Sequence, residues 1–172
     1  MKLEQVIDVE SGQMDSWWGS YHSAFGPLEA MSSCRQSFSR EEFVAVMVNP
    51  KAEKFVALTD DGGLIGLAIV VPPSELTWIS PGFYAERFPG RDVRYYGAIH
   101  VDPAHQGGRH FFDFCKWLAK MESERGSVVA YDVAAFNEVV TKVVVAAFEA
   151  AEAVFEHQVV STQEYHVIDV KA

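Results

Sequence analysis

The sequence predicts an α/β (α+β) fold, in which a mixed, mostly antiparallel sheet of about seven strands is flanked by about four helices. Two observations carry this prediction. Two apolar, β-branched runs at residues 54–59 and 64–71 flank Asp60-Asp61-Gly62-Gly63, which is a strong hairpin signal. Segments with helical spacing of apolar residues separate the remaining strand-like runs. The length of 172 residues fits one domain, so we expect residues 1–172 to form a single unit.

The N-terminal part of the chain predicts one strand and two helices. Apolar residues alternate over 5–9, which is typical of a strand, and recur at helical spacing over 14–25, where Gly26-Pro27 should end the helix. Ser39 and Glu42 have the spacing of a capping box. A second, short helix should therefore follow Ser39.

Residues 72–91 are rich in proline, glycine and aromatic side chains, Trp78 among them. We expect a structured loop with one helical turn there, and loops of this length are often functional. The next predicted elements are a strand at 93–101, a helix at 111–121 that Gly126 closes, and a buried strand at 127–134.

The C-terminal part contains an ambiguous segment, residues 137–153. Its valines favour a strand by propensity, whereas its length and the spacing of Val140, Val144 and Ala147 favour a helix, which is our prediction. Residues 154–160 and 164–170 should then form a closing hairpin.

The charge balance narrows the class of ligand. Fourteen basic and 24 acidic side chains give a net charge of −10. Such a field repels phosphate backbones and anionic membrane surfaces, so we expect no nucleic acid or membrane partner. It concentrates cations, which favours an amine-bearing small molecule or peptide.

The two cysteines, Cys34 and Cys115, are too few for a disulfide framework, so we expect free thiols in a reducing compartment. The N-terminus carries Glu4 and Asp8 where a signal peptide would need an apolar run, and the longest apolar stretch is shorter than the ~18 residues of a membrane span. We therefore predict a cytoplasmic protein.

Residues 99–111 are the most informative stretch for function. The chain runs from a strand through Gly107-Gly108 into a helix, an arrangement that presents free backbone N–H groups and the positive end of a helix dipole to an anion. A plain turn gives the same pattern of two glycines before a helix.

At these residues the sequence resembles the GNAT superfamily of acyl-CoA-dependent N-acyltransferases. Ile99-His100-Val101-Asp102-Pro103 with Gln106 matches the first part of that family's motif, and the predicted order of strands and helices is similar to that of the family. The resemblance implies a central strand that splays from its neighbour and binds acetyl-CoA through the backbone of Ile99 and Val101. It also implies that the amides of Gln106, Gly107, Gly108, Arg109 and His110 hold the pyrophosphate, and that Asn137 contacts the cofactor.

The sequence departs from the family pattern at three positions. Arg109 and Phe111 stand where the family has glycine or alanine, and Val144 stands where many members carry a tyrosine that protonates the leaving thiolate. Arg109 either crowds the diphosphate or pairs with a phosphate. Position 144 therefore has no tyrosine that could act as a general acid.

Acyl transfer to an amine needs a base for the ammonium and donors for the oxyanion. Asp132 matches the family's acidic position in the fifth strand and is our first candidate base, acting directly or through a water; an exposed carboxylate at a strand end is the structural alternative. His100 is the second candidate, because its ordinary pKa is about 6.5. A hydrogen-bonded core histidine is its structural alternative. Tyr95 and Tyr96 are weaker candidates for an acid.

No cluster in the sequence has the spacing of a metal site, since His100, His105 and His110 match no common zinc arrangement. The sequence thus predicts an N-acetyltransferase that moves an acetyl group from acetyl-CoA to a primary amine. The alternatives are a non-catalytic module of the same fold that senses a ligand or binds a protein, and, more weakly, an acidic surface that occupies a basic partner. A homodimer is compatible with either function.

Overall fold

The computed structural model describes residues 1–29, 31 and 37–162. Its centre is a five-stranded sheet in which the strands follow one another in chain order. The first four strands pair with one another in antiparallel fashion, and the fourth and fifth strands are parallel. The strands are β1 (Lys2–Val6), β2 (Glu53–Leu58), β3 (Leu64–Val71), β4 (Val93–Val101) and β5 (Val128–Ala130).

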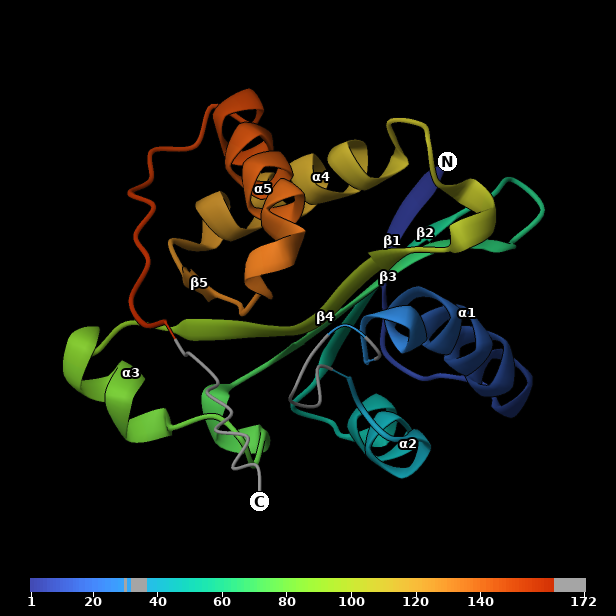
Figure 1. The fold of residues 1–172 in the computed structure, drawn as a ribbon, viewed down its shortest axis with the longest axis horizontal. Helices are drawn as coiled ribbons and strands as arrows, with labels where there is room; N and C mark the ends of the chain where they lie inside the picture. Colours follow the sequence, from blue (N-terminus) through green and yellow to red (C-terminus); the bar gives the residue numbers. More distant parts are fainter. Residues whose placement is uncertain (30, 32–36, 163–172) are drawn as a thin grey trace, which may run out of the picture.

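Helices cover both faces of the sheet (Figure 1). On one side lie α1 (Ser11–Glu29) and α2 (Arg40–Val48), and on the other lie α4 (His110–Arg125) and α5 (Glu138–Ala150). The short helix α3 (Pro81–Arg87) precedes β4. Three single turns of 3₁₀ helix, η1 (Pro73–Glu75), η2 (Pro103–His105) and η3 (Ala135–Asn137), connect the longer elements.

Local signals in the sequence set several of these boundaries. The predicted hairpin is confirmed, with Gly62 at a φ of +90° in the turn between β2 and β3. The capping box is also confirmed, because Ser39 accepts from the backbone of Glu42 while the Glu42 carboxylate accepts from the backbone of Ser39. At the end of α4, Gly126 adopts the left-handed conformation, with a φ of +66°, that favours glycine.

Helix α1 is longer than predicted, since it continues through Gly26 and Pro27 to Glu29. Proline removes one backbone donor, but this loss falls in the last turn, where packing outweighs it. The ring of Phe25 lies edge-on to that of His100 on β4 with centroids 5.8 Å apart, which holds this end of α1 on the sheet. The predicted loop at 72–91 likewise contains more helix than one turn, because both η1 and α3 lie within it.

The C-terminal part differs most from the prediction. β5 spans only Val128–Ala130 rather than 127–134. Residues 154–160 form no strand, and Val154 and Val159 are exposed. A β-branched run becomes a strand only where a neighbouring strand completes its hydrogen bonds. The predicted partner, 164–170, lies outside the described residues. The described sheet therefore has five strands instead of about seven, whereas the helix predicted at 137–153 is confirmed as α5.

Two apolar cores lie on the two faces of the sheet. The α1-side core contains Tyr21, Phe38 and Phe43 together with Tyr95 and Ala98 of β4. The α4-side core contains Tyr96 and Val101 of β4, with Phe114 and Leu118 of α4. β4 therefore supplies side chains to both cores, as expected for a central strand.

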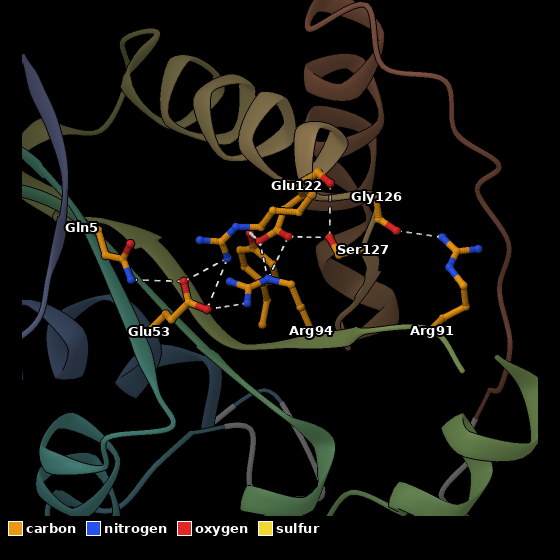
Figure 2. A network of polar contacts seen from close by, with 9 residues as sticks. Gln5, Glu53, Arg91, Arg94, Glu122, Gly126 and Ser127 are labelled. Carbon is orange, nitrogen blue, oxygen red and sulfur yellow. Dashed lines mark hydrogen bonds and ion pairs between the residues drawn. The ribbon is translucent and has the colours of Figure 1, made fainter. Parts of the chain in front are cut away.

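A buried charge network fixes α4 against the sheet (Figure 2). The guanidinium of Arg94 on β4 donates to Glu53 on β2, and its Nε donates to the carboxylate of Glu122 on α4 at 2.9 Å. Glu122 is 2% exposed and also accepts from the hydroxyl groups of Tyr96 and Ser127. Burial alone would raise the pKa of Glu53, but hydrogen bonds from Arg94 and Arg125 hold it below its usual value. This network ties β2, β4, α4 and the start of β5 together.

Candidate functional site

The central feature of the site is a gap between β4 and β5. The two strands pair only from Val93 opposite Val128 to Tyr95 opposite Ala130. β4 continues to Val101, but β5 ends at Ala130, so the strands diverge from this point. The register between β3 and β4 also shifts here and leaves Gly97 without a partner residue, which is the pattern of a β-bulge. The splayed strand that the sequence resemblance implies is therefore present.

A cavity of about 530 Å³ occupies this gap. Its lining comes from both apolar cores, because Ala98 belongs to the α1-side core whereas Tyr96 and Leu118 belong to the α4-side core. The cavity therefore passes from one face of the sheet to the other. Of the predicted site residues, Ile99, Asp132 and Asn137 line it.

Beyond Tyr95, the edge of β4 that faces the gap carries backbone groups that β5 does not pair with. The N–H of Asp102 donates to the carbonyl of Ile65 on β3 at 2.7 Å. Because backbone groups alternate along a strand, those of Ile99 and Val101 point away from β3, toward the gap. The carbonyl of Val101 accepts a long hydrogen bond of 3.5 Å from the side chain of Gln106. These are the two residues whose backbone the resemblance assigns to acetyl-CoA.

The turn between β4 and α4 is exposed and open. Gly107 has a φ of +89°, a conformation that favours glycine, and neither Gly107 nor Gly108 is covered. No side chain caps the N-terminus of α4, so its first N–H groups, beginning at His110, have no partner within the helix. The turn itself does not line the cavity.

Arg109 and Phe111 leave this turn accessible. The Arg109 side chain is 78% exposed, its Nη2 lies 3.3 Å from the carboxylate of Asp113, and its guanidinium lies over the ring of Phe112. Phe111 packs against the α4-side core. Both side chains therefore lie along the first turn of α4 rather than across the glycines.

Asp132 follows β5 by two residues and is exposed at the cavity. Its carboxylate accepts a hydrogen bond from the hydroxyl of Tyr95, a β4 residue that is 1% exposed. Burial and the neighbouring Asp132 charge raise the pKa of Tyr95, so the phenol keeps its proton and acts as a fixed donor. Among the described residues that line the cavity, Asp132 is the only one with a charged side chain.

His100 lies apart from the cavity, in the α1-side face of β4. Its imidazole is 5% exposed, lies edge-on to the rings of Tyr21 and Phe25, and has its Nε2 at 3.0 Å from the hydroxyl of Ser20. Burial lowers its pKa to about 4. The side chain is therefore neutral at pH 7 and packs as part of the core.

The remaining lining of the α4-side half is mostly apolar, although Tyr131 and Asn137 also belong to it. Val144 lines the cavity from α5, where many members of the resembled family have a tyrosine. The thiol of Cys115 also lines it, and burial raises the pKa of this thiol to about 12, so it is not a nucleophile at neutral pH. Cys34 lies outside the described residues.

Neither a metal centre nor a membrane span is found in the described part of the chain. Within it, no three His, Cys, Asp or Glu side chains are placed to hold a metal ion. The rings of His105 and His110, which flank the turn, have centroids 6.3 Å apart. Every described helix is too short or too polar to span a bilayer.

Sequence reasoning missed the aromatic wall of the cavity on the α1 side. Phe38 and Trp78 form part of this wall; Trp78 lies within the predicted loop 72–91, and Phe38 lies just before the helix predicted after Ser39. One signal for it was the density of aromatic residues in 72–91, which is unusual for a solvent-exposed connection, and another was the aromatic spacing over 14–25, which includes Phe25.

Comparison with solved structures places this fold among acetyltransferases. A probable acetyltransferase matches with a TM-score of 0.58 at 18% identity, over 98% of this chain and 99% of the other. An aminoglycoside acetyltransferase from an uncultured soil metagenomic sample matches with a TM-score of 0.55 at 13% identity, over 98% and 96%. The aminoglycoside N-acetyltransferase AAC(6')-Iy, solved in complex with CoA, matches with a TM-score of 0.51 at 16% identity, over 95% and 99%.

These matches cover nearly the whole of each chain, so they concern the complete arrangement of elements rather than one motif. The chain therefore has an acetyltransferase fold. It is the fold of the GNAT superfamily, as the resemblance at residues 99–106 implies. No protein-family model matches the sequence, and no curated protein is significantly similar to it.

Proposed function

We propose that residues 1–172 act as a single cytoplasmic N-acyltransferase domain that moves an acetyl group from acetyl-CoA to a primary amine. One observation carries the proposal: the gap between β4 and β5 brings the free edge of β4 and the carboxylate of Asp132 to one cavity. Similar folds in known acetyltransferases, one of them solved with CoA, support it.

The residues present fit acetyl-CoA. The backbone groups of Ile99 and Val101 that point into the gap, the Val101 carbonyl with only a long hydrogen bond from Gln106, offer an edge for the amides of the pantetheine arm. The exposed Gly107-Gly108 turn and the uncapped start of α4 offer N–H donors to the pyrophosphate, and Arg109 adds a positive charge beside them. Asn137 lines the cavity at the start of α5, where its amide can contact the cofactor.

Asp132 would act as the general base in this reaction. An alkylammonium must lose a proton before its nitrogen can attack, and Asp132 is the charged group at the cavity that can accept it, directly or through a water. The hydroxyl of Tyr95 orients the carboxylate by donating to it. We assign no proton transfer to His100, because it does not reach the cavity.

The remaining requirement is stabilisation of the developing oxyanion. When bound, acetyl-CoA supplies a thioester whose carbonyl carbon accepts the amine nitrogen. Backbone N–H groups at the Gly97 bulge of β4 are the donors that this chain offers to the carbonyl oxygen. No acid at position 144 is needed for departure of the sulfur, because a thiol with a pKa of about 8.5 leaves readily as a thiolate.

The second candidate function is a non-catalytic module of the same fold. Val144 is the observation that favours it, since the cavity offers an apolar side chain where a proton donor stands in many members of the resembled family. Such a module would bind acetyl-CoA without turnover.

Acetyl transfer by the purified protein, followed as CoA release with a panel of amines, separates the two functions. We expect turnover by the wild type and a loss of turnover of about a hundredfold or more in Asp132→Asn, because general-base catalysis contributes about 10²–10⁴-fold. The affinity for acetyl-CoA should stay within a few-fold. Asp60→Asn is the matched control, because Asp60 lies 99% exposed in the β2–β3 turn. Binding of acetyl-CoA without turnover of any amine would favour the non-catalytic module.

A further inference from the structure

The α1-side half of the cavity is an aromatic and aliphatic wall. Phe25 and Leu28 come from α1, Phe38 lies just before α2, and Trp78 and Ile79 follow η1. The rings of Phe38 and Trp78 contact each other with centroids 5.4 Å apart. Trp78 is 46% exposed, so this wall opens to solvent at one end. A ligand can therefore reach the gap between β4 and β5 along an apolar surface.

The charge of this half of the cavity is as informative as its shape. Asp132 is the only charged side chain among its described lining residues, and the carboxylate of Glu29, outside that lining, accepts a hydrogen bond from the hydroxyl of Ser37. One carboxylate can balance one ammonium group. Every further charge on a ligand would meet the apolar wall without a counterion, which is costly.

The volume sets a further limit. About 530 Å³ lies within the roughly 300–1,000 Å³ of small-molecule sites, and this space must also hold the acetyl-bearing end of the pantetheine arm. The acceptor is therefore small. A flat ring on a short chain uses such a space best, because aromatic rings pack edge-on or offset against Phe38 and Trp78.

From these observations, and resting on the acetyl-transfer function above, we propose that the acceptor is a small aromatic monoamine. Its ring packs against Phe38, Trp78 and Ile79, and its single ammonium group faces Asp132 at the open edge of β4. Polyamines and aminoglycosides, which carry several charges, are poor acceptors for this chain.

A panel of amines tests the substrate class. With saturating acetyl-CoA, kcat/KM should be at least tenfold higher for 2-phenylethylamine and tryptamine than for spermidine, kanamycin or the N-terminus of a glycine-initiated peptide. A preference for spermidine, kanamycin or the peptide would overturn the inference while leaving the acetyl-transfer function intact. Binding of acetyl-CoA, measured separately by isothermal titration, reports on that function alone.

The variant Trp78→Ala tests the wall directly. We expect it to raise the KM for 2-phenylethylamine about tenfold, equivalent to about 1.4 kcal/mol, with little change in kcat or in acetyl-CoA affinity. Phe83→Ala is the matched control, because Phe83 is an exposed aromatic residue, at 39%, outside the cavity lining.

Titration of 2-phenylethylamine into the protein without acetyl-CoA provides a second readout. Binding by the wild type that weakens in Trp78→Ala supports the aromatic-amine site even if acetyl transfer is never found. Equal affinities in the wild type and in Trp78→Ala would overturn it.

Discussion

The imidazole of His100 is enclosed by aromatic rings, whereas the carboxylate of Asp132 is exposed at the cavity. Both residues are candidate bases from their types, and the family resemblance ranks Asp132 first and His100 second. The structure adds the direction in which each side chain points. A strand alternates its side chains, so His100 faces α1 while the backbone of Ile99 faces the gap.

The buried His100 makes stability depend on pH in a definite direction. Its pKa is about 4 in the folded protein, against ~6.5 in the unfolded chain. Between these values the unfolded state binds one more proton, so stability decreases as the pH falls from about 6.5 to about 4, by about 3 kcal/mol. Urea unfolding at pH 7 and pH 4.5 measures this loss.

His100→Gln supplies the matched comparison. This variant should be less stable at pH 7 because its packing is worse, but it should lose less stability on acidification. Carboxylates such as Glu53 titrate in both proteins, so the difference isolates the imidazole. Parallel pH curves for the two proteins would show that His100 is not buried as described.

At the scale of elements, α4 and the turn before it decide whether the site accepts a diphosphate. The turn is open because Arg109 extends toward Asp113. Its guanidinium is thus held near the uncapped start of the helix, where the dipole also favours an anion. Sequence reasoning leaves two orientations for Arg109, and the structure has the outward one.

Arg109→Ala is therefore expected to weaken acetyl-CoA binding, by about 1 kcal/mol or about fivefold at low salt, since the side chain is exposed and screened. The loss should shrink at high salt. Isothermal titration at two salt concentrations measures both effects.

Asp113→Asn is the counterpart variant, because it releases Arg109 from its ion pair and removes a negative charge near the phosphates. Binding should become tighter. Unchanged or tighter binding by Arg109→Ala would mean that this arginine obstructs the site.

The elements that sequence reasoning placed correctly have strong local signals. The glycine-containing turn between β2 and β3, the Ser39–Glu42 capping box and Gly126 each fix a boundary through their own chemistry. Residues 154–160 have strand propensity only, and the described structure gives them no partner. Pro27 failed as a helix stop because packing of the end of α1 against β4, where Phe25 contacts His100, outweighs one lost donor. For residues 154–160 and for Pro27, contacts with residues distant in the sequence decide whether the strand or the helix forms there.

The candidate site was predictable to the same extent. The motif at residues 99–110 marks the β4 edge and the turn, and Asp132 was a candidate from its position in the strand predicted at 127–134, although it lies two residues after β5. The aromatic wall could not be assigned, because its members come from α1, from the residues before α2 and from the loop after η1. Only the folded chain brings these three segments to one cavity.

At the scale of the whole molecule, a net charge of −10 opposes an anionic cosubstrate and attracts a cationic acceptor. In the proposed function, acetyl-CoA would therefore find its positive potential locally, at Arg109 and at the start of α4. A cationic acceptor would reach Asp132 with the help of the same overall field. The two proposed ligands would thus be drawn to different parts of one site.

Thermal unfolding in the presence of acetyl-CoA tests the central claim most directly. At about 100 times its Kd, the ligand should stabilise the folded state by about 2.7 kcal/mol, which corresponds to a rise in Tm of roughly 5–11 °C for a chain of this size. ATP at the same concentration is the control and should give a smaller shift, because it lacks the pantetheine arm that the β4 edge would bind. An unchanged Tm with both acetyl-CoA and longer acyl-CoAs would contradict the assignment of the gap between β4 and β5 as an acyl-CoA site.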